Sequence, residues 1–352
     1  KCFYYLITFA FTKEGRPYLR SPDQFAVPPI QVHDHTTSTN SIIRQLPCTQ
    51  FHKPLGVMQA PSLSSDGEFQ RLQAKIQSLA KLILPARLSA EETWTYIYCS
   101  LRPALAWSAP IANLTQSQWK RLMSPLLPVL LNNLGYPRTF PRSVVYAPIE
   151  LGGLGMIDFH AEQGYAHIMH LLYSLRKQDE VGKLLHVTLE WAQRFSGYSQ
   201  SILTAPSLPM HHVPSPWLRT TLDHLQRTDC TVQYSIGTVV RLQRVYDKSI
   251  MDETVTLKPQ VTAAINRCRL YLKAETFADI CTPNGLHFLP TLFRGSPCLP
   301  SNTRSLWPYQ PNPGPRSWAA FRKFLRQYLS PSGRLTVPLG PWLASGPTRQ
   351  WH

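Results

Sequence analysis

The sequence predicts an α+β protein: a short antiparallel β-meander at the N-terminus, then a mostly α-helical body and a proline-rich, basic C-terminal segment. Three observations indicate this class. The first 60 residues contain short aromatic and β-branched runs separated by turn sequences. Apolar residues then recur at three- and four-residue steps, which is typical of amphipathic helices. After Gly285, the chain contains eleven prolines.

Residues 1–61 are expected to form the β-rich part. Five runs have strand composition: Cys2–Phe11, Tyr18–Arg20, Ile30–His33, Ser41–Leu46 and Lys53–Gln59. The sequence KEGRP provides a turn between the first two runs, and HTTSTN suits a hairpin between the third and the fourth. The fifth run, KPLGVMQ, is predicted to be one more short strand.

Residues 62–135 are expected to form a helical domain. Asp66 is a plausible N-cap, and an apolar stripe follows it: Phe69, Leu72, Ile76, Leu79, Leu82 and Ile83. Arg71, Lys75 and Lys81 lie off this stripe, so the first helix is predicted to carry a basic face.

Two more helices are predicted in the same domain. Ser89 and Glu92 have the spacing of a capping box, in which each side chain satisfies a free backbone N–H at the start of a helix. A third helix begins after Thr115 and stops at Gly135, with kinks expected where Pro125 and Pro128 interrupt it.

The rest of the chain divides by composition into a helical connector at 136–205, a second helical unit at 206–285 and a proline-rich basic segment at 286–352. The helices predicted there are Asp158–Arg176, Gln178–Phe195, Ser215–Thr228, Lys258–Ala278 and Ser317–Leu329. The last of these is amphipathic, with arginines and a lysine away from its aromatic face.

Three glycines close together, Gly152, Gly153 and Gly155, raise the question of a phosphate-binding loop. Such a loop opens directly into a helix and usually presents a lysine to the anion. Here an apolar pair follows the glycines, and the next lysine is Lys177. A structural turn that leads to a helix N-cap at Asp158 is therefore the better interpretation.

The charge of the chain points to a polyanionic partner. The formal net charge is +16, and no acidic residue occurs from Ile280 to the end. Nucleic acid is the first candidate and an anionic membrane surface the second. The N-terminal uncharged run of about eleven residues is too short to span a bilayer. Seven scattered cysteines do not suggest a disulfide framework, so a reducing, intracellular compartment is expected.

Reactive groups do not converge in the sequence. The carboxylates are too scattered to predict a two-metal centre, and no motif for a nucleophile is present. His160, His167 and His170 share a helical face that could bind a metal or simply pack. Cys281, His287 and Cys298 have loose spacing for zinc. The residues alone thus indicate a basic binding protein without its own reaction centre and without a metal site.

The order of the elements resembles that of a family. A chain that opens with KCFYYLI, passes through KPLGV and enters a basic helix is similar to the end of the palm of a reverse transcriptase of the non-long-terminal-repeat retrotransposon type. The resemblance continues through LGYPRTFPRSVVYAPIELGGLG and INRCRLYLKAETFADI, and so covers most of the chain. It implies that Leu55, Gly56 and Val57 form the primer grip, that Phe69–Leu134 is the thumb and that the glycines form the family's turn.

The same resemblance implies a fragment of the polymerase, because the family's catalytic aspartates would lie upstream of Lys1. We therefore expect an incomplete N-terminal sheet. Lys1 would donate a proton to pyrophosphate only in the intact polymerase, which would use Mg²⁺ and include the upstream segment of the same polyprotein. The chain itself would contain no catalytic residue and no cofactor, and its location would be intracellular and nuclear.

The partner expected from the resemblance is an RNA/DNA primer–template, held through its phosphates. The residues predicted to contact it are Lys53, Arg71, Lys75, Lys81, Arg87, Lys120, Arg138 and Arg142. The alternative hypothesis is a non-enzymatic nucleic-acid-binding protein derived from a decayed or domesticated retroelement. A metalloprotein built on the histidine face is a third reading.

Overall fold

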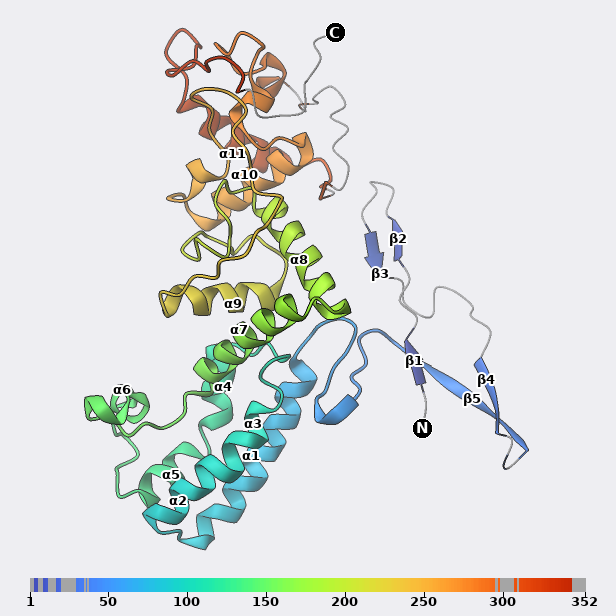
Figure 1. The fold of residues 1–352 in the computed structure, drawn as a ribbon, viewed down its shortest axis with the longest axis vertical. Coiled ribbons are helices and arrows are strands. Elements are labelled where there is room, and N and C mark those ends of the chain that lie inside the picture. Colours follow the sequence, from blue (N-terminus) through green and yellow to red (C-terminus); the bar gives the residue numbers. More distant parts are fainter. Residues whose placement is uncertain are drawn as a thin grey trace. The chain divides into compact units, whose positions relative to one another are not determined.

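The computed structural model describes residues 3–5, 9–11, 17–19, 30–34, 36, 38–294, 297, 307–308 and 310–343. The described residues form two compact units, of which one ends at His170 and the other begins at Leu171 (Figure 1). The predicted α+β class is confirmed: short strands precede a mostly helical body. The boundary between the units falls inside a helix of the predicted connector. None of the helices described is long and apolar enough to cross a bilayer.

The N-terminal strands form two small sheets. Strand β5 (Thr39–Leu46) pairs antiparallel with β4 (Ile30–Asp34), as the predicted hairpin requires. Strand β1 (Phe3–Tyr5) pairs with the other side of β5, but in parallel, with Phe3 opposite Arg44. Strands β2 (Phe9–Phe11) and β3 (Pro17–Leu19) form an antiparallel pair. A simple meander pairs only neighbours, whereas the long connection between β1 and β5 permits parallel pairing.

Both faces of the β4–β5 hairpin carry exposed apolar side chains. Ile30 and Val32 lie on one face, where they pair with Ile43 and Ser41 of β5. The exposed fraction is 43% for Ile30 and 45% for Val32. Ile42 lies on the other face and is 66% exposed. Ile30, Val32 and Ile42 are therefore not covered by the described residues, whereas Leu46 at the end of β5 is buried.

The predicted strand Lys53–Gln59 is wrong in its central part. Pro54–Gly56 form a turn of 3₁₀-helix, and only the ends of the run are extended, where His52 and Gln59 form an antiparallel bridge. The reason is local: Pro54 favours the first position of a helical turn, and Gly56 adopts a positive φ of 93° that closes it.

The helices of residues 62–135 follow the sequence prediction in part. Helix α1 (Asp66–Ala86) is followed by α2 (Ala90–Tyr96), a π-helical turn (Ile97–Leu101) and α3 (Arg102–Ala106). Helices α4 (Gln116–Met123) and α5 (Leu127–Asn133) replace the single kinked helix, with the break beside Pro125. The predicted capping box of Ser89 with Glu92 is present, and Thr115 forms a second one with Gln118. The N-cap of α1 is Ser65 instead of Asp66.

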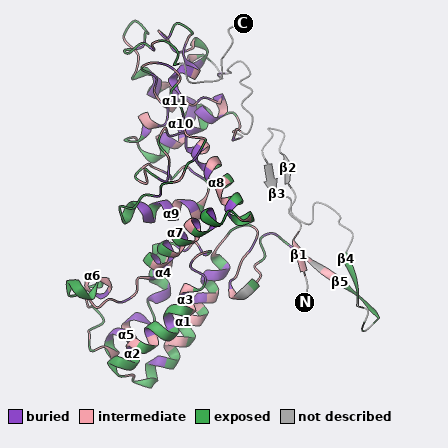
Figure 2. Ribbon diagram, viewed as in Figure 1, coloured by how far each residue is buried: buried purple, intermediate pink, exposed green. Residues whose placement is uncertain are grey.

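The core of the first unit forms where the apolar stripes of these helices meet (Figure 2). Its fully buried side chains include Leu72, Ile76, Leu105, Leu126, Leu130 and Val145. Val145 belongs to the short helix α6 (Arg142–Tyr146), and Phe159 enters the same core from the start of α7 (Phe159–Lys177). Helices α1, α4 and α5 thus bury a common face, and of their charged residues only Glu68 on α1 is buried.

The second unit contains α8 (Glu180–Ser196), α9 (Pro216–Arg227), α10 (Pro259–Leu272) and α11 (Pro315–Arg326). Helix α10 ends earlier than predicted because Lys273 adopts a left-handed conformation that stops it. Helix α11 packs against α10 and buries Trp318, Phe321 and Phe324, so these aromatic residues belong to the core.

Candidate nucleic-acid interface

The segment His52–Gln59, called the 52–59 loop below, contains Leu55, Gly56 and Val57, the residues predicted to form a primer grip. Two backbone hydrogen bonds of 2.8 Å between His52 and Gln59 close its base. At its tip, the N–H of Val57 donates to the carbonyl of Pro54 (3.1 Å). The side chain of Val57 is buried, whereas Lys53 is exposed. Of these two side chains, that of Lys53 is therefore the one accessible to a phosphate.

Gly56 is required at the tip of this loop. Its φ of 93° is unfavourable for any residue with a Cβ, and a Cβ there would lie 3.4 Å from Nε1 of Trp107. The tip of the loop therefore lies against the indole ring. Trp107 follows α3 directly and is 64% exposed.

Glu68 fastens the 52–59 loop to helix α1. Its carboxylate is 1% exposed and accepts a hydrogen bond from the N–H of Met58 (2.8 Å). Arg71, one turn further along the helix, donates to both carboxylate oxygens, with Nε–Oε2 at 2.8 Å and Nη2–Oε1 at 2.5 Å. This hydrogen bond raises the pKa of Arg71 above its ordinary value. Arg71 therefore neutralises a buried carboxylate and is not part of an open basic face.

The other predicted phosphate ligands in this unit have no acidic partner. Among the described residues, no ion pair involves Lys53, Lys75, Lys81, Arg87, Lys120, Arg138 or Arg142. All of them are exposed except Lys75, which is partly buried. Arg138 and Arg142 are neighbours, since Nη2 of Arg142 donates to the carbonyl of Arg138 (2.9 Å). These seven cations are available to an anionic ligand.

The cations of α1 do not lie on one face. With about 100° per residue, Lys81 is rotated about 120° from Lys75 around the helix axis. The prediction of a single basic face on this helix is therefore wrong, because Arg71 is engaged and the two lysines diverge. A duplex would therefore contact both lysines only if it lay along the side of α1 that is between them.

Arg121 is a candidate that the sequence reading missed. It lies on α4 beside Lys120, and its guanidinium carbon is 5.2 Å from the ring centre of Phe69 on α1. A signal was present: from Thr93 to Ile149 the chain has five basic residues and no acid. Helix α4 thus adds positive charge to the same unit through Lys120 and Arg121, as do Arg138 before α6 and Arg142 at its start. Of these five residues, only Arg102 has a carboxylate partner among the described residues, Glu162, at 2.8 Å.

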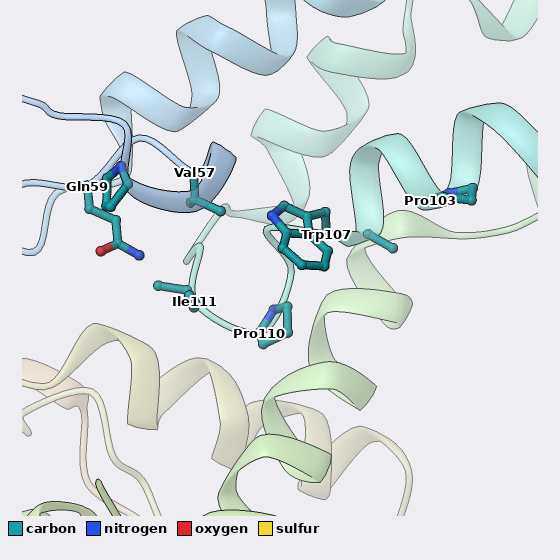
Figure 3. A pocket seen from close by; sticks show the side chains of 8 residues that line it. Val57, Gln59, Pro103, Trp107, Pro110 and Ile111 are labelled. Atoms are coloured by element: carbon teal, nitrogen blue, oxygen red, sulfur yellow. The ribbon is translucent and has the colours of Figure 1, made fainter.

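An open apolar groove lies between the 52–59 loop and the segment that follows α3 (Figure 3). We call it the Trp107 groove. Its volume is about 630 Å³, and the residues labelled in the figure that line it are Val57, Gln59, Pro103, Trp107, Pro110 and Ile111. Gln59 provides the only side-chain amide of this lining.

The glycine turn offers no donors for an anion. The N–H groups of Gly152, Gly153 and Gly155 donate to the carbonyls of Ile149, Pro148 and Ala147 at 2.9, 3.0 and 2.9 Å. Gly152 and Gly155 have positive φ, and a Cβ on Gly153 would lie 2.1 Å from the carbonyl oxygen of Ala147. These glycines therefore build a tight turn, after which Asp158 accepts a hydrogen bond from the N–H of His160 (2.9 Å) at the start of α7.

Two of the three histidines of α7 face the interior, and His170 is partly buried. His160 and His167 are buried, and Nε2 of His167 donates to the carbonyl of Ala112 (2.8 Å). Burial lowers the pKa of His167 from its ordinary value to about 4, so this imidazole is neutral near pH 7. In the part of the chain that the structure describes, no three His, Cys, Asp or Glu side chains gather as a metal site would need.

Several parts of the prediction lie outside the described residues, among them Lys1, the side chain of Leu55 and Cys298. The comparisons with known proteins add no identification. No family model matches the sequence, and neither a curated protein nor a solved structure matches it.

Proposed function

We propose that this chain is a C-terminal portion of a retroelement reverse transcriptase that positions an RNA/DNA primer–template without supplying the catalytic aspartates. The upstream segment of the same polyprotein would supply them and bind Mg²⁺, and the location would be nuclear. The resemblance of the sequence motivates this proposal. The observation that supports it best is the 52–59 loop, a rigid glycine turn held on a helix that begins a unit with many unpaired cations.

The charge of this unit supports nucleic acid as the partner. Between Lys53 and Ile149 there are ten basic and four acidic residues, and one of the four acids, Glu68, is already neutralised inside the fold. Contacts from lysine and arginine to phosphates fix the register of a duplex without reading its sequence. The unit would therefore hold any primer–template of suitable shape.

The test is binding of the purified chain to a labelled RNA/DNA primer–template over a range of salt concentrations. The variant Lys75→Glu/Lys81→Glu removes two predicted phosphate contacts, while Arg71 is left intact because it stabilises the fold. Each phosphate contact contributes about one unit to the slope of log affinity against log salt, so the variant should lower the slope by about two.

The matched control is Lys177→Glu/Lys183→Glu in the second unit, which changes the net charge equally at two exposed lysines. It should leave the slope unchanged. An equal loss in both variants would mean that only net charge matters, and this would contradict a specific surface on the first unit. Absence of binding by the wild-type chain near physiological salt would overturn the proposed function.

A further inference from the structure

The Trp107 groove keeps an aromatic ring exposed although the rest of the unit buries its tryptophans more deeply. Trp107 is 64% exposed, whereas Trp119 is 3% exposed and Trp94 is partly buried. Ile111, on the same groove, is 51% exposed. Burial of an aromatic side chain is favourable, so an exposed indole on a concave surface indicates a ligand that covers it.

The groove is rigid on both sides. On one side, Glu68 holds the 52–59 loop through Met58. On the other, the segment after Trp107 is tied at three points: the N–H of Asn113 donates to Ser65 Oγ (2.9 Å), Gln163 exchanges hydrogen bonds with Leu114 (3.1 and 3.0 Å), and His167 donates to Ala112 (2.8 Å). Because these walls are fixed in advance, little conformational entropy is lost when a ligand enters.

The chemistry of the lining selects a flat, mostly apolar ligand. The walls include Pro54, Pro103 and Pro110, which have no backbone N–H to donate. The side-chain amide of Gln59 forms no hydrogen bond with the described residues, and an amide can both donate to and accept from the edge of a base. Lys53 is exposed and precedes Pro54 of the lining, so the loop beside the groove carries a positive charge that could meet a phosphate.

We propose that Trp107 stacks on one base of the primer strand that the 52–59 loop positions, and that Gln59 forms a hydrogen bond with the edge of this base. The proposal rests on the proposed function and names the ligand of the groove. Charge complementarity favours a nucleotide over an apolar segment of a partner protein, because the loop beside the groove carries a lysine and the surrounding unit is strongly basic. Aromatic side chains bind bases of any sequence through their π-faces.

The experiment combines variants of Trp107 with primers in which one nucleotide lacks its base. A set of primer–templates carries a single abasic site at successive positions from the primer end, and affinity is measured by fluorescence anisotropy. For the wild-type chain, one position should weaken binding about tenfold, and the others should have little effect. Trp107→Ala should bind the intact primer about tenfold more weakly than the wild type. Its affinity should not fall further when the abasic site is at the sensitive position. Trp107→Phe should retain most of the affinity and the position dependence.

The outcomes separate the two proposals. Base stacking is overturned if Trp107→Ala binds the primer as tightly as the wild type. It is also overturned if the loss of affinity from Trp107→Ala adds to the loss from the abasic site at every position. The groove would then be a docking surface for a protein partner. If the wild-type chain does not bind primer–template at all in the salt titration, the proposed function fails together with this inference. Thermal unfolding of each variant shows that a loss of affinity is not a loss of folded protein.

Discussion

Arg71 and Glu68 form a two-point ion pair on the first turns of α1, and the carboxylate of this pair also holds the N–H of Met58. Glu68 is 1% exposed and Arg71 is 20% exposed, so the pair lies mostly out of water. The position of the 52–59 loop thus depends on a charged group inside the protein. A residue that the sequence suggested as a phosphate ligand instead maintains the geometry of the proposed primer grip.

Replacing Arg71 by Met should destabilise the chain by about 3 kcal/mol, because Glu68 would remain buried without its cation. Urea denaturation measures this change. The double variant Glu68→Gln/Arg71→Met should be less destabilised than the sum of the two single variants, since the neutral amide needs no counter-charge. If Arg71→Met left the stability unchanged and lowered the salt dependence of primer–template binding, Arg71 would be a phosphate ligand after all.

Acid should weaken the first unit through His167. Burial lowers the pKa of this imidazole in the folded protein to about 4, below its ordinary value of 6.5. The unfolded chain therefore binds a proton more readily, so the contribution of His167 is complete above pH 6.5 and is lost as the pH falls to about 4. The expected loss is about 3 kcal/mol over this window. Neighbouring His160 and His170 act in the same direction when they are protonated.

The variant His167→Gln isolates this effect, because glutamine keeps a donor for Ala112 but does not titrate. Its unfolding free energy should change less between pH 6.5 and pH 4 than that of the wild type, by the same amount of about 3 kcal/mol. His212 in the second unit also has a pKa lowered by burial, to about 3, and is unchanged in both proteins. Parallel pH profiles for the two proteins would show that His167 does not titrate in this window.

Thiol reactivity should divide the described cysteines into two groups. Cys99 and Cys230 are exposed, whereas Cys48, Cys268 and Cys281 are buried. Burial raises the pKa of Cys268 and of Cys281 to about 12, so neither is a thiolate at neutral pH. A maleimide should modify Cys99 and Cys230 in the native protein and the buried three only after unfolding, as read by mass spectrometry of peptides. Native labelling of Cys268 as fast as that of Cys99 would contradict the packing of α10.

Sequence reading was accurate where the determinant is local. The capping boxes of Ser89 and Thr115 act over three residues, and the starts of the two helices were predicted correctly, whereas the helix after Thr115 ends at Met123 and not at Gly135. The ion pair between Glu68 and Arg71 also has local spacing, i to i+3, and could have been anticipated from the sequence. What the spacing does not show is that the carboxylate is buried, since this depends on Met58, which arrives from another element.

The parts that were not predicted depend on partners distant in the sequence. Gln163 binds Leu114 and Trp119, more than forty residues before it, and so shapes one wall of the Trp107 groove. The parallel pairing of β1 with β5 joins residues about forty positions apart. Neither the hydrogen bonds of Gln163 nor this strand pairing produces a periodic pattern in the sequence. The groove itself consists of common residues, prolines, a tryptophan and an isoleucine, which acquire meaning only when the fold brings them together.

The end of α8 should be sensitive to a single methyl group. The guanidinium of Arg269, on α10, is fully buried and donates through Nη2 to the carbonyls of Arg194 (3.1 Å) and Phe195 (2.8 Å) in the last turn of α8. These carbonyls have no partner within a helix, so Arg269 acts as a C-terminal cap. Gly197, which ends the helix with a φ of 74°, lies so close that a Cβ would be 2.5 Å from the guanidinium carbon.

Gly197→Ala should therefore destabilise the second unit by about 2 kcal/mol or more, through a strained backbone and displacement of Arg269. The matched control is Gly333→Ala in the same unit, where φ is 77° and nothing lies within 4 Å of the added Cβ. It shares the backbone strain but not the collision, so the difference between the two variants in urea denaturation measures the contact with Arg269. Equal stability of the two variants would mean that the guanidinium moves aside without cost, and its role as the cap of α8 would have to be abandoned.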